Sequence, residues 1–67
     1  MKATFKRIKY GWGVMVTGGK PSCGDWVEAT TKDGDMFDVR IKAVLKQTRR
    51  GVICAIMPEE RVVLALK

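Results

Sequence analysis

The chain has 67 residues, with 13 Lys and Arg against 7 Asp and Glu, and its formal net charge is +6. We expect one domain over residues 1–67 with a simple fold, because a chain of this length buries only about 60% of its unfolded surface. The basic balance favours an anionic partner, most commonly nucleic acid, although net charge also serves solubility. The sequence shows neither a long apolar run nor a basic and apolar leader, which predicts a cytoplasmic protein with no membrane partner.

The residue types exclude most catalytic and metal sites. The chain contains no histidine, so it offers no imidazole base and no mixed Cys/His zinc site, and two cysteines are too few for zinc. We therefore expect a protein that is not an enzyme and that needs no metal or cofactor. Cys54 is expected to be a buried thiol and Cys23 a turn residue, with a single disulfide between them as the alternative.

Residues 1–9 favour a β-strand lined with positive charge. Phe5 and Ile8 differ in parity, so either a bulge lies between them or one of the two side chains points outward. A second short strand is predicted over residues 12–17, after a Gly-Trp-Gly sequence. We interpret Trp12 as a plug at the core or its edge, with stacking on a ligand as the alternative role.

Residues 24–45 have the alternation of a β-hairpin around an Asp-Gly-Asp turn. We expect the odd-numbered side chains from 27 to 45 to point into the interior. A three-residue loop over 33–35 pairs Ala29 with Val39, so that the core faces agree, whereas a two-residue loop would set a core position opposite a solvent position. The hairpin is therefore predicted with the longer loop.

That register makes two predictions about the outer face of the hairpin. It sets Glu28 opposite Arg40 as an exposed ion pair, and Trp26 opposite Lys42 as a cation–π contact. The outer face would then hold an aromatic ring among basic side chains.

The next predicted strand follows a turn over residues 47–51, whose tip carries Arg49 and Arg50. Residues 52–57 are apolar at every position, which predicts the most buried strand, covered on both faces.

Two interpretations compete for residues 58–67. Proline followed by acids and a terminal lysine fits a short helix, whereas the apolar run over 62–66 fits a closing strand. We favour the strand, with or without a single helical turn at 58–61. The predicted fold is all-β, a strongly bent sheet or barrel of five or six strands, SH3-like or OB-like, with a short C-terminal helix as the open alternative.

The leading functional hypothesis is a non-enzymatic β-barrel that binds nucleic acid, single-stranded DNA or RNA, without sequence preference. Binders of this kind combine a cationic surface with rings on which bases stack. Trp26 is the first candidate for stacking, with Tyr10 and Trp12 second. The predicted interface consists of Trp26, Arg40, Lys42, Lys46, Arg49, Arg50, Lys6, Arg7, Lys9 and Tyr10.

Several sequence elements resemble small β-barrel segments of phage- and plasmid-encoded DNA-handling proteins. They are Trp12-Gly13-Val14-Met15-Val16, then Pro21-x-x-Gly24-Asp25-x-Val27, then Asp33-Gly34 before the alternating strand through Val39 and Ile41. The Gly24-Asp25-x-Val27 piece is also similar to the first strand of ribosome-associated KOW-type barrels, without the glycine-rich second half of that motif. The resemblance covers residues 12–45 and implies a barrel fold in a DNA-handling context.

A protein-binding module is the alternative from a different class, such as a small inhibitor or adaptor encoded by a phage or another mobile element. Three methionines, with Trp26, would form its apolar docking patch, or an edge strand would pair with a partner or with a second copy as a homodimer. Salt separates the two hypotheses, because phosphate binding weakens steeply with ionic strength and an apolar contact does not.

Overall fold

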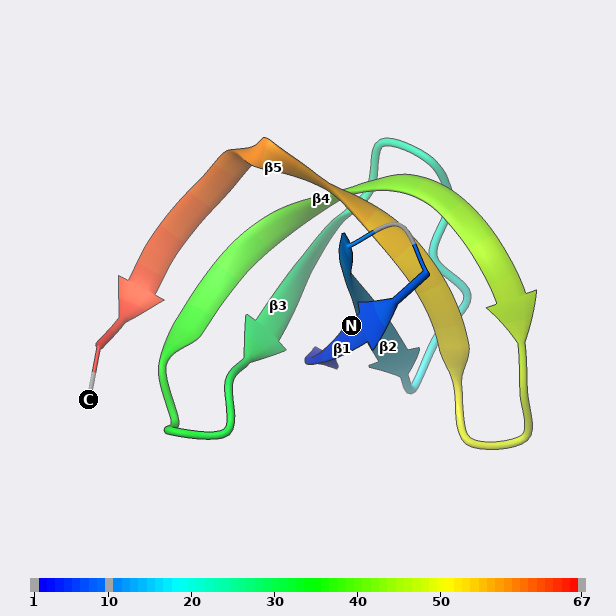
Figure 1. Ribbon diagram of the computed structural model, residues 1–67, viewed down its shortest axis with the longest axis horizontal. Coiled ribbons are helices and arrows are strands. Elements are labelled where there is room, and N and C mark those ends of the chain that lie inside the picture. Colours follow the sequence, from blue (N-terminus) through cyan, green and yellow to red (C-terminus); the bar gives the residue numbers. More distant parts are fainter. Residues whose placement is uncertain (1, 10, 67) are drawn as a thin grey trace.

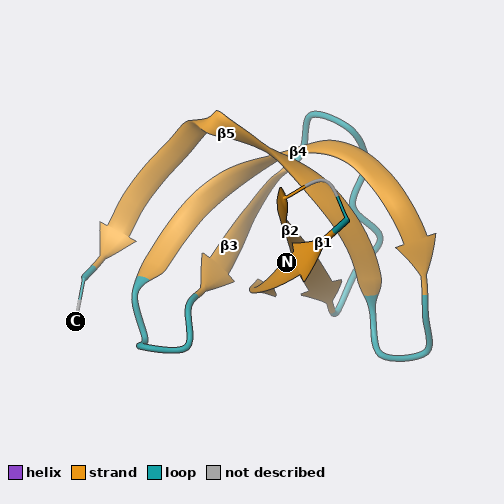
Figure 2. Cartoon of the chain, in the orientation of Figure 1, coloured by secondary structure: helices purple, strands orange, loops and turns teal. Residues whose placement is uncertain are grey.

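The computed structural model describes residues 2–9 and 11–66, and in that part of the chain it contains five β-strands and no helix (Figures 1 and 2). The strands are β1 (Lys2–Ile8), β2 (Gly11–Thr17), β3 (Trp26–Thr30), β4 (Met36–Gln47) and β5 (Val52–Ala65). The predicted all-β class is confirmed. The segment after Pro58 continues β5 as a strand, so the helical alternative and the helical turn are both wrong.

The five strands close into a barrel in the order β1-β2-β5-β4-β3. Four neighbouring pairs are antiparallel, and the barrel is closed by a short parallel pairing that joins Lys2, Ala3 and Thr4 of β1 to β3. β2 contacts β5 only over residues 13–16, which pair with residues 52–55. Beyond residue 55, β5 leaves β2 and continues along the first half of β4 (Figure 1).

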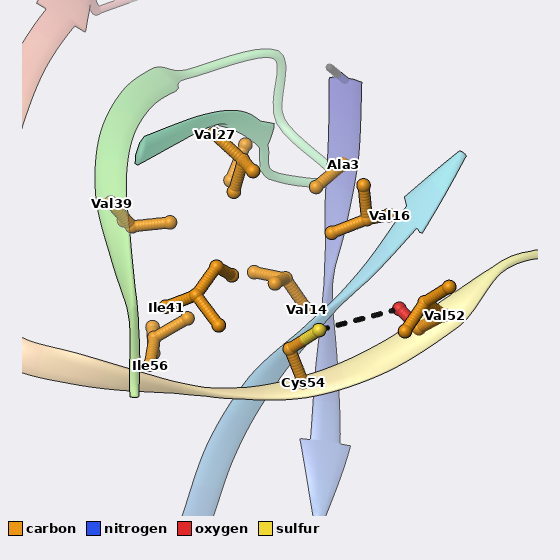
Figure 3. Packing of buried hydrophobic residues seen from close by; sticks show 10 residues of the cluster. Ala3, Val14, Val16, Val27, Val39, Ile41, Val52, Cys54 and Ile56 are labelled. Carbon is orange, nitrogen blue, oxygen red and sulfur yellow. Dashed lines mark hydrogen bonds between the residues drawn. The ribbon is translucent and has the colours of Figure 1, made fainter. Parts of the chain in front are cut away.

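A small aliphatic core fills the barrel (Figure 3). Its largest fully buried side chains are Ile41, Val14, Val16, Val27, Val39 and Cys54. Among the described residues no polar or charged side chain is buried. The core is thus held by apolar burial, at about 25 cal/mol per Å² removed from water.

The predicted inward alternation holds along most of the hairpin. Val27, Ala29, Val39 and Ile41 are each at most 1% exposed. The prediction is wrong at Leu45, which is 45% exposed. Register shifts on the far side of Ile41 break the period-2 pattern of β4, and β3 no longer lies alongside that part of the strand.

The turn between β3 and β4 has the predicted length of three residues, but it lies over residues 32–34, one position earlier than expected. Val27 faces Val39 and Ala29 faces Phe37, an offset of two residues from the expected pairing. Thr31 closes the loop: its N–H donates to the carbonyl of Asp35 at 2.9 Å, its carbonyl accepts from the N–H of Gly34 at 3.1 Å, and its Oγ1 accepts from the N–H of Asp35 at 3.1 Å. An offset of two preserves parity, and for that reason the core faces still agree.

The corrected register also changes the outer face. Trp26 stands opposite Arg40, and Glu28 stands opposite Asp38. The predicted cross-strand pairs, Glu28 with Arg40 and Trp26 with Lys42, are therefore wrong.

The first half of β5 is covered on one face, not on two. Val52, Cys54 and Ile56 are buried, whereas the residues between them are half-buried. The sheet is a single curled layer, and in the described part of the chain no second layer covers its outer surface. The prediction that residues 52–57 are covered on both faces is therefore wrong.

β1 settles the question of Phe5 and Ile8. Its register with β2 runs without a shift from Lys2 to Ile8, so no bulge lies between the two side chains and they leave on opposite faces. Phe5 packs edge-on against Phe37, with ring centroids 5.9 Å apart. Ile8 lies over Gly13, where a Cβ would collide with the carbonyl oxygen of Cys54. Glycine at position 13 therefore lets β1, β2 and β5 approach closely.

Both cysteines are free thiols, as expected: Cys23 is exposed and Cys54 is buried. Burial raises the pKa of the Cys54 thiol above its ordinary value of 9.0. Its Sγ contacts the carbonyl oxygen of Val52 at 3.8 Å, so Cys54 packs as a small hydrophobic residue (Figure 3).

Candidate nucleic-acid interface

Arg40 is held by contacts within the protein. Its Nε donates to the carbonyl of Gly24 at 3.1 Å, and its Nη1 donates to the carboxylate of Glu60 at 3.1 Å. The guanidinium therefore joins the start of the β3 hairpin to β5. Its positive charge already has a carboxylate partner at salt-bridge distance.

Trp26 of β3 and the two predicted lysines of β4 are exposed. The ring of Trp26 is 44% exposed at the start of β3, on the outer face. Lys42 and Lys46 are also exposed. The expected exposure of Trp26 is thus confirmed, but its cross-strand neighbour is the ion-paired Arg40.

The arginines of the β4–β5 turn lie at a distance from Trp26. Thr48 organises this turn, because its N–H and its Oγ1 both donate to the carbonyl of Gly51 at 2.8 Å. Arg49 and Arg50 are exposed at its tip. They follow the end of β4, roughly 20 Å along the strand from the position paired with Trp26 at about 3.3 Å per residue. A short ligand cannot contact both places.

The predicted cations of the first hairpin are exposed. They are Lys6, Arg7 and Lys9. Arg7 pairs directly with Trp12 across the β1–β2 ladder, so the two side chains leave the same face of the hairpin. Tyr10 lies outside the described residues.

A groove of about 510 Å³ opens where β2 and β5 part. The β1–β2 hairpin forms one wall, and β4 and β5 form the other. The lining residues are Phe5, Ile8, Gly11, Trp12, Thr31, Phe37, Lys42, Ala55, Ile56, Pro58 and Arg61. The groove follows from the topology. The β2–β5 ladder ends at the pair of Gly13 and Ala55, and the parts of the two strands beyond this pair do not cover each other.

Trp12 lies at the mouth of this groove and is 62% exposed. The interpretation of Trp12 as a plug at the core or its edge is wrong, because most of its surface remains exposed to solvent. Its parity matches that of Val14 and Val16, which are fully buried, but β5 does not lie alongside β2 at this position. The ring continues the core face beyond the end of the ladder.

The remaining rings of the groove form a layered contact with a cation. The guanidinium carbon of Arg61 lies 5.1 Å from the centroid of the Phe37 ring, within the range of a cation–π interaction. Phe37 in turn packs edge-on against Phe5. Among the described lining residues the charged ones are Lys42 and Arg61, both cationic. The groove thus offers flat apolar surface bordered by positive charge.

Sequence reasoning missed Phe5, Phe37 and Arg61 as site residues. For Phe5 and Phe37 the sequence pattern held a clue, since each has the same parity as buried residues on its strand and so lies on the inner face of the sheet. The pattern held no such clue for Arg61, because its place beside Phe37 depends on an irregular register between β4 and β5.

Residues 2–9 and 11–66 hold neither a metal-binding cluster nor a membrane-spanning helix. No group of three or more His, Cys, Asp or Glu side chains in that part of the chain could hold a metal ion. None of the described segments is a helix long and apolar enough to cross a membrane.

No protein-family model, curated protein or solved structure matches this chain.

Proposed function

We propose that the protein is a non-enzymatic nucleic-acid-binding barrel that takes up single-stranded DNA or RNA without sequence preference. The observation that carries the proposal is the groove between β2 and β5. It combines an exposed indole, two phenyl rings and two cations, and among its described lining residues none is acidic.

Each component of the groove suits one part of a nucleotide. A base presents a flat apolar face that stacks on an aromatic ring, worth about 1–3 kcal/mol per base. Trp12 offers such a face to solvent, and Phe37 is already covered on one side by Arg61. Lys42 and Arg61 supply charge for the phosphates, and Arg7 stands beside Trp12 on the same hairpin.

The position of the rings favours single strands. In a duplex the bases are stacked on one another and their faces are not available to a side chain, whereas unpaired bases can be splayed onto protein rings. The groove lies between strands and has no projecting helix or ribbon in the described residues that would enter a duplex groove. The described lining residues suit the faces of bases and the phosphates, which are common to all nucleotides, so we propose no sequence preference.

The test is a titration of a fluorescein-labelled oligothymidine and of a duplex of the same length at two ionic strengths. We expect the single strand to bind more tightly, with an affinity that falls steeply as salt rises because counterions are released. Trp12→Ala should weaken binding by about tenfold, and Trp26→Ala serves as the matched control on the outer face. If the Trp12→Ala variant binds as tightly as the parent, the groove is not the binding site. If binding does not respond to salt, the proposed nucleic-acid-binding function is wrong.

A protein-binding module is the second candidate function. The three methionines that sequence reasoning assigned to a docking patch, Met15, Met36 and Met57, are half-buried. The apolar surface lies instead at residues 62–66, which are exposed. A partner bound there should remain bound at high salt, in contrast to an oligonucleotide in the groove.

A further inference from the structure

The C-terminal half of β5 has an unpaired edge. Over Arg61–Ala65 this strand pairs with β4 on one side, and in the described part of the chain no strand pairs with its other side. Figure 1 shows this half at the rim of the sheet, away from β1 and β2. Such an edge presents a row of unsatisfied N–H and C=O groups that can template another strand.

The same segment is apolar and exposed on both faces. The exposed fractions are 52% for Val62, 54% for Val63, 48% for Leu64 and 70% for Leu66. Successive side chains of a strand point to opposite faces, so these residues expose apolar surface above and below the sheet. A free edge with apolar side chains on both faces is the pattern that natural sheets avoid unless another strand covers it.

We infer that the C-terminal half of β5 pairs antiparallel with the same segment of a second copy of this chain. The partner strand must have a free edge and must be apolar on both faces. Among the described strands, the C-terminal half of β5 is the one that meets both conditions. Nucleic acid does not fit this segment, because residues 62–66 carry no positive charge.

Symmetry and the bounds of the strand together select the register. In a two-fold antiparallel pair, facing residues must share a parity, so the axis passes through one residue. An axis at Val63 sets Val62 opposite Leu64 and Arg61 opposite Ala65, so that all five residues of the free edge over Arg61–Ala65 are paired. An axis at Leu64 would pair only Val63, Leu64 and Ala65 within the strand, because β5 ends at Ala65.

The interface is short, so the dimer should be weak and dependent on concentration. A stable interface buries about 800 Å² on each partner, and the free edge of a five-residue strand offers less than that. Association driven by apolar burial and backbone hydrogen bonds should persist at high salt. That behaviour separates it from oligonucleotide binding in the groove.

Sedimentation equilibrium from micromolar to millimolar protein tests the pairing. We expect the parent chain to shift from monomer to dimer across this range. Val63→Lys and Val63→Glu should each remain monomeric, because the axis brings two like charges together, and an equimolar mixture of the two should recover a dimer. Leu45→Lys is the matched control: Leu45 is also an exposed leucine, but it lies on the far half of β4, so this variant should dimerise like the parent.

Circular dichroism establishes that each variant is folded. If a substitution at Val63 prevents folding, Val62→Lys mixed with Leu64→Glu tests the same register, since those positions face each other across the axis and the mixed dimer gains a Lys–Glu pair that neither variant has alone. A parent chain that remains monomeric at millimolar concentration overturns the inference, as does a folded Val63→Lys variant that dimerises like the parent. Recovery in a mixture of Leu64→Lys and Leu64→Glu, but not in the Val63 mixture, overturns the register.

Discussion

Arg40 and Glu60 are joined by an ion pair in which Nη1 of the arginine donates to both carboxylate oxygens, at 3.1 and 3.3 Å. Along β4, Arg40 stands between Val39, which pairs with Arg61, and Ile41, which pairs with Ile56. Residues 57–60 of β5 therefore face a single residue of β4. The ion pair holds this irregular segment against the sheet at the point where β5 bends away from β2.

The first prediction separates Arg40 from Lys42. Arg40→Ala should lower the free energy of unfolding by about 1–2 kcal/mol, because it removes a half-exposed ion pair and a hydrogen bond to the Gly24 carbonyl. Oligonucleotide affinity should change little. Lys42→Ala should leave stability within about 0.5 kcal/mol and weaken oligonucleotide binding about three- to tenfold. Urea unfolding and fluorescence anisotropy measure the two effects, and identical behaviour of the two variants would contradict the division of roles.

The second prediction concerns the core. Ile41→Ala should cost about 2–5 kcal/mol, because Ile41 is 0% exposed and its truncation leaves a cavity. For a domain whose total stability is about 5 kcal/mol or a little more, that loss approaches complete unfolding. Leu45→Ala is the control on the same strand, and its 45% exposure should limit the cost to about 0.5–1 kcal/mol. Thermal unfolding followed by circular dichroism gives both values; equal costs would show that the burial of β4 is wrongly assigned.

The third prediction concerns the cation on Phe37. Arg61→Gln should weaken oligonucleotide binding and reduce the slope of log affinity against log salt by about one, the amount that one phosphate contact contributes. Lys20→Gln removes the same charge from the exposed loop between β2 and β3, outside the groove. The control should retain the slope of the parent. If both variants reduce the slope equally, the protein binds through its net charge and the groove has no special role.

The fourth prediction is a pH dependence. Burial raises the pKa of Cys54, so between its ordinary value of 9.0 and the higher folded value the folded chain holds a proton that the unfolded chain releases. The contribution of Cys54 to stability is therefore complete below pH 9 and declines as the pH rises above it. Urea unfolding at pH 8 and at about pH 10 should show that the free energy of unfolding falls more in the parent than in Cys54→Val, which has no thiol to titrate. If it falls by the same amount in both chains, the pH dependence comes from other groups.

The sequence predicted the class of fold because its strongest signals are local. Alternation between Val27 and Ile41 reports burial directly, and Asp33-Gly34 marks a turn whatever its exact position. The exact register was not accessible in the same way. It depends on hydrogen bonds such as the one from the N–H of Asp35 to the hydroxyl of Thr31, and a turn of the same length placed one residue later differs from it in free energy by less than a propensity argument resolves.

The groove could not be predicted because it results from where a ladder ends. Trp12 has the parity of a core residue, and a sequence pattern cannot say that β5 has already diverged from β2 at that position. Arg61 reaches Phe37 only because the segment before it is irregular. Parity arguments assume continuous pairing, so they fail first at the ends of ladders and at bulges.

The parallel contact between β1 and β3 involves three residue pairs, whereas β1 is bound to β2 along its whole length. This is the briefest joint in the barrel, and it links segments that are remote in the chain, so the amides on either side of it should exchange with solvent faster than those of β4. When the joint separates, the N-terminal hairpin remains attached through the four pairs between β2 and β5. We expect the hairpin to move about the β2–β5 ladder when this happens, which would open the side of the barrel to the single strand that we propose as its ligand.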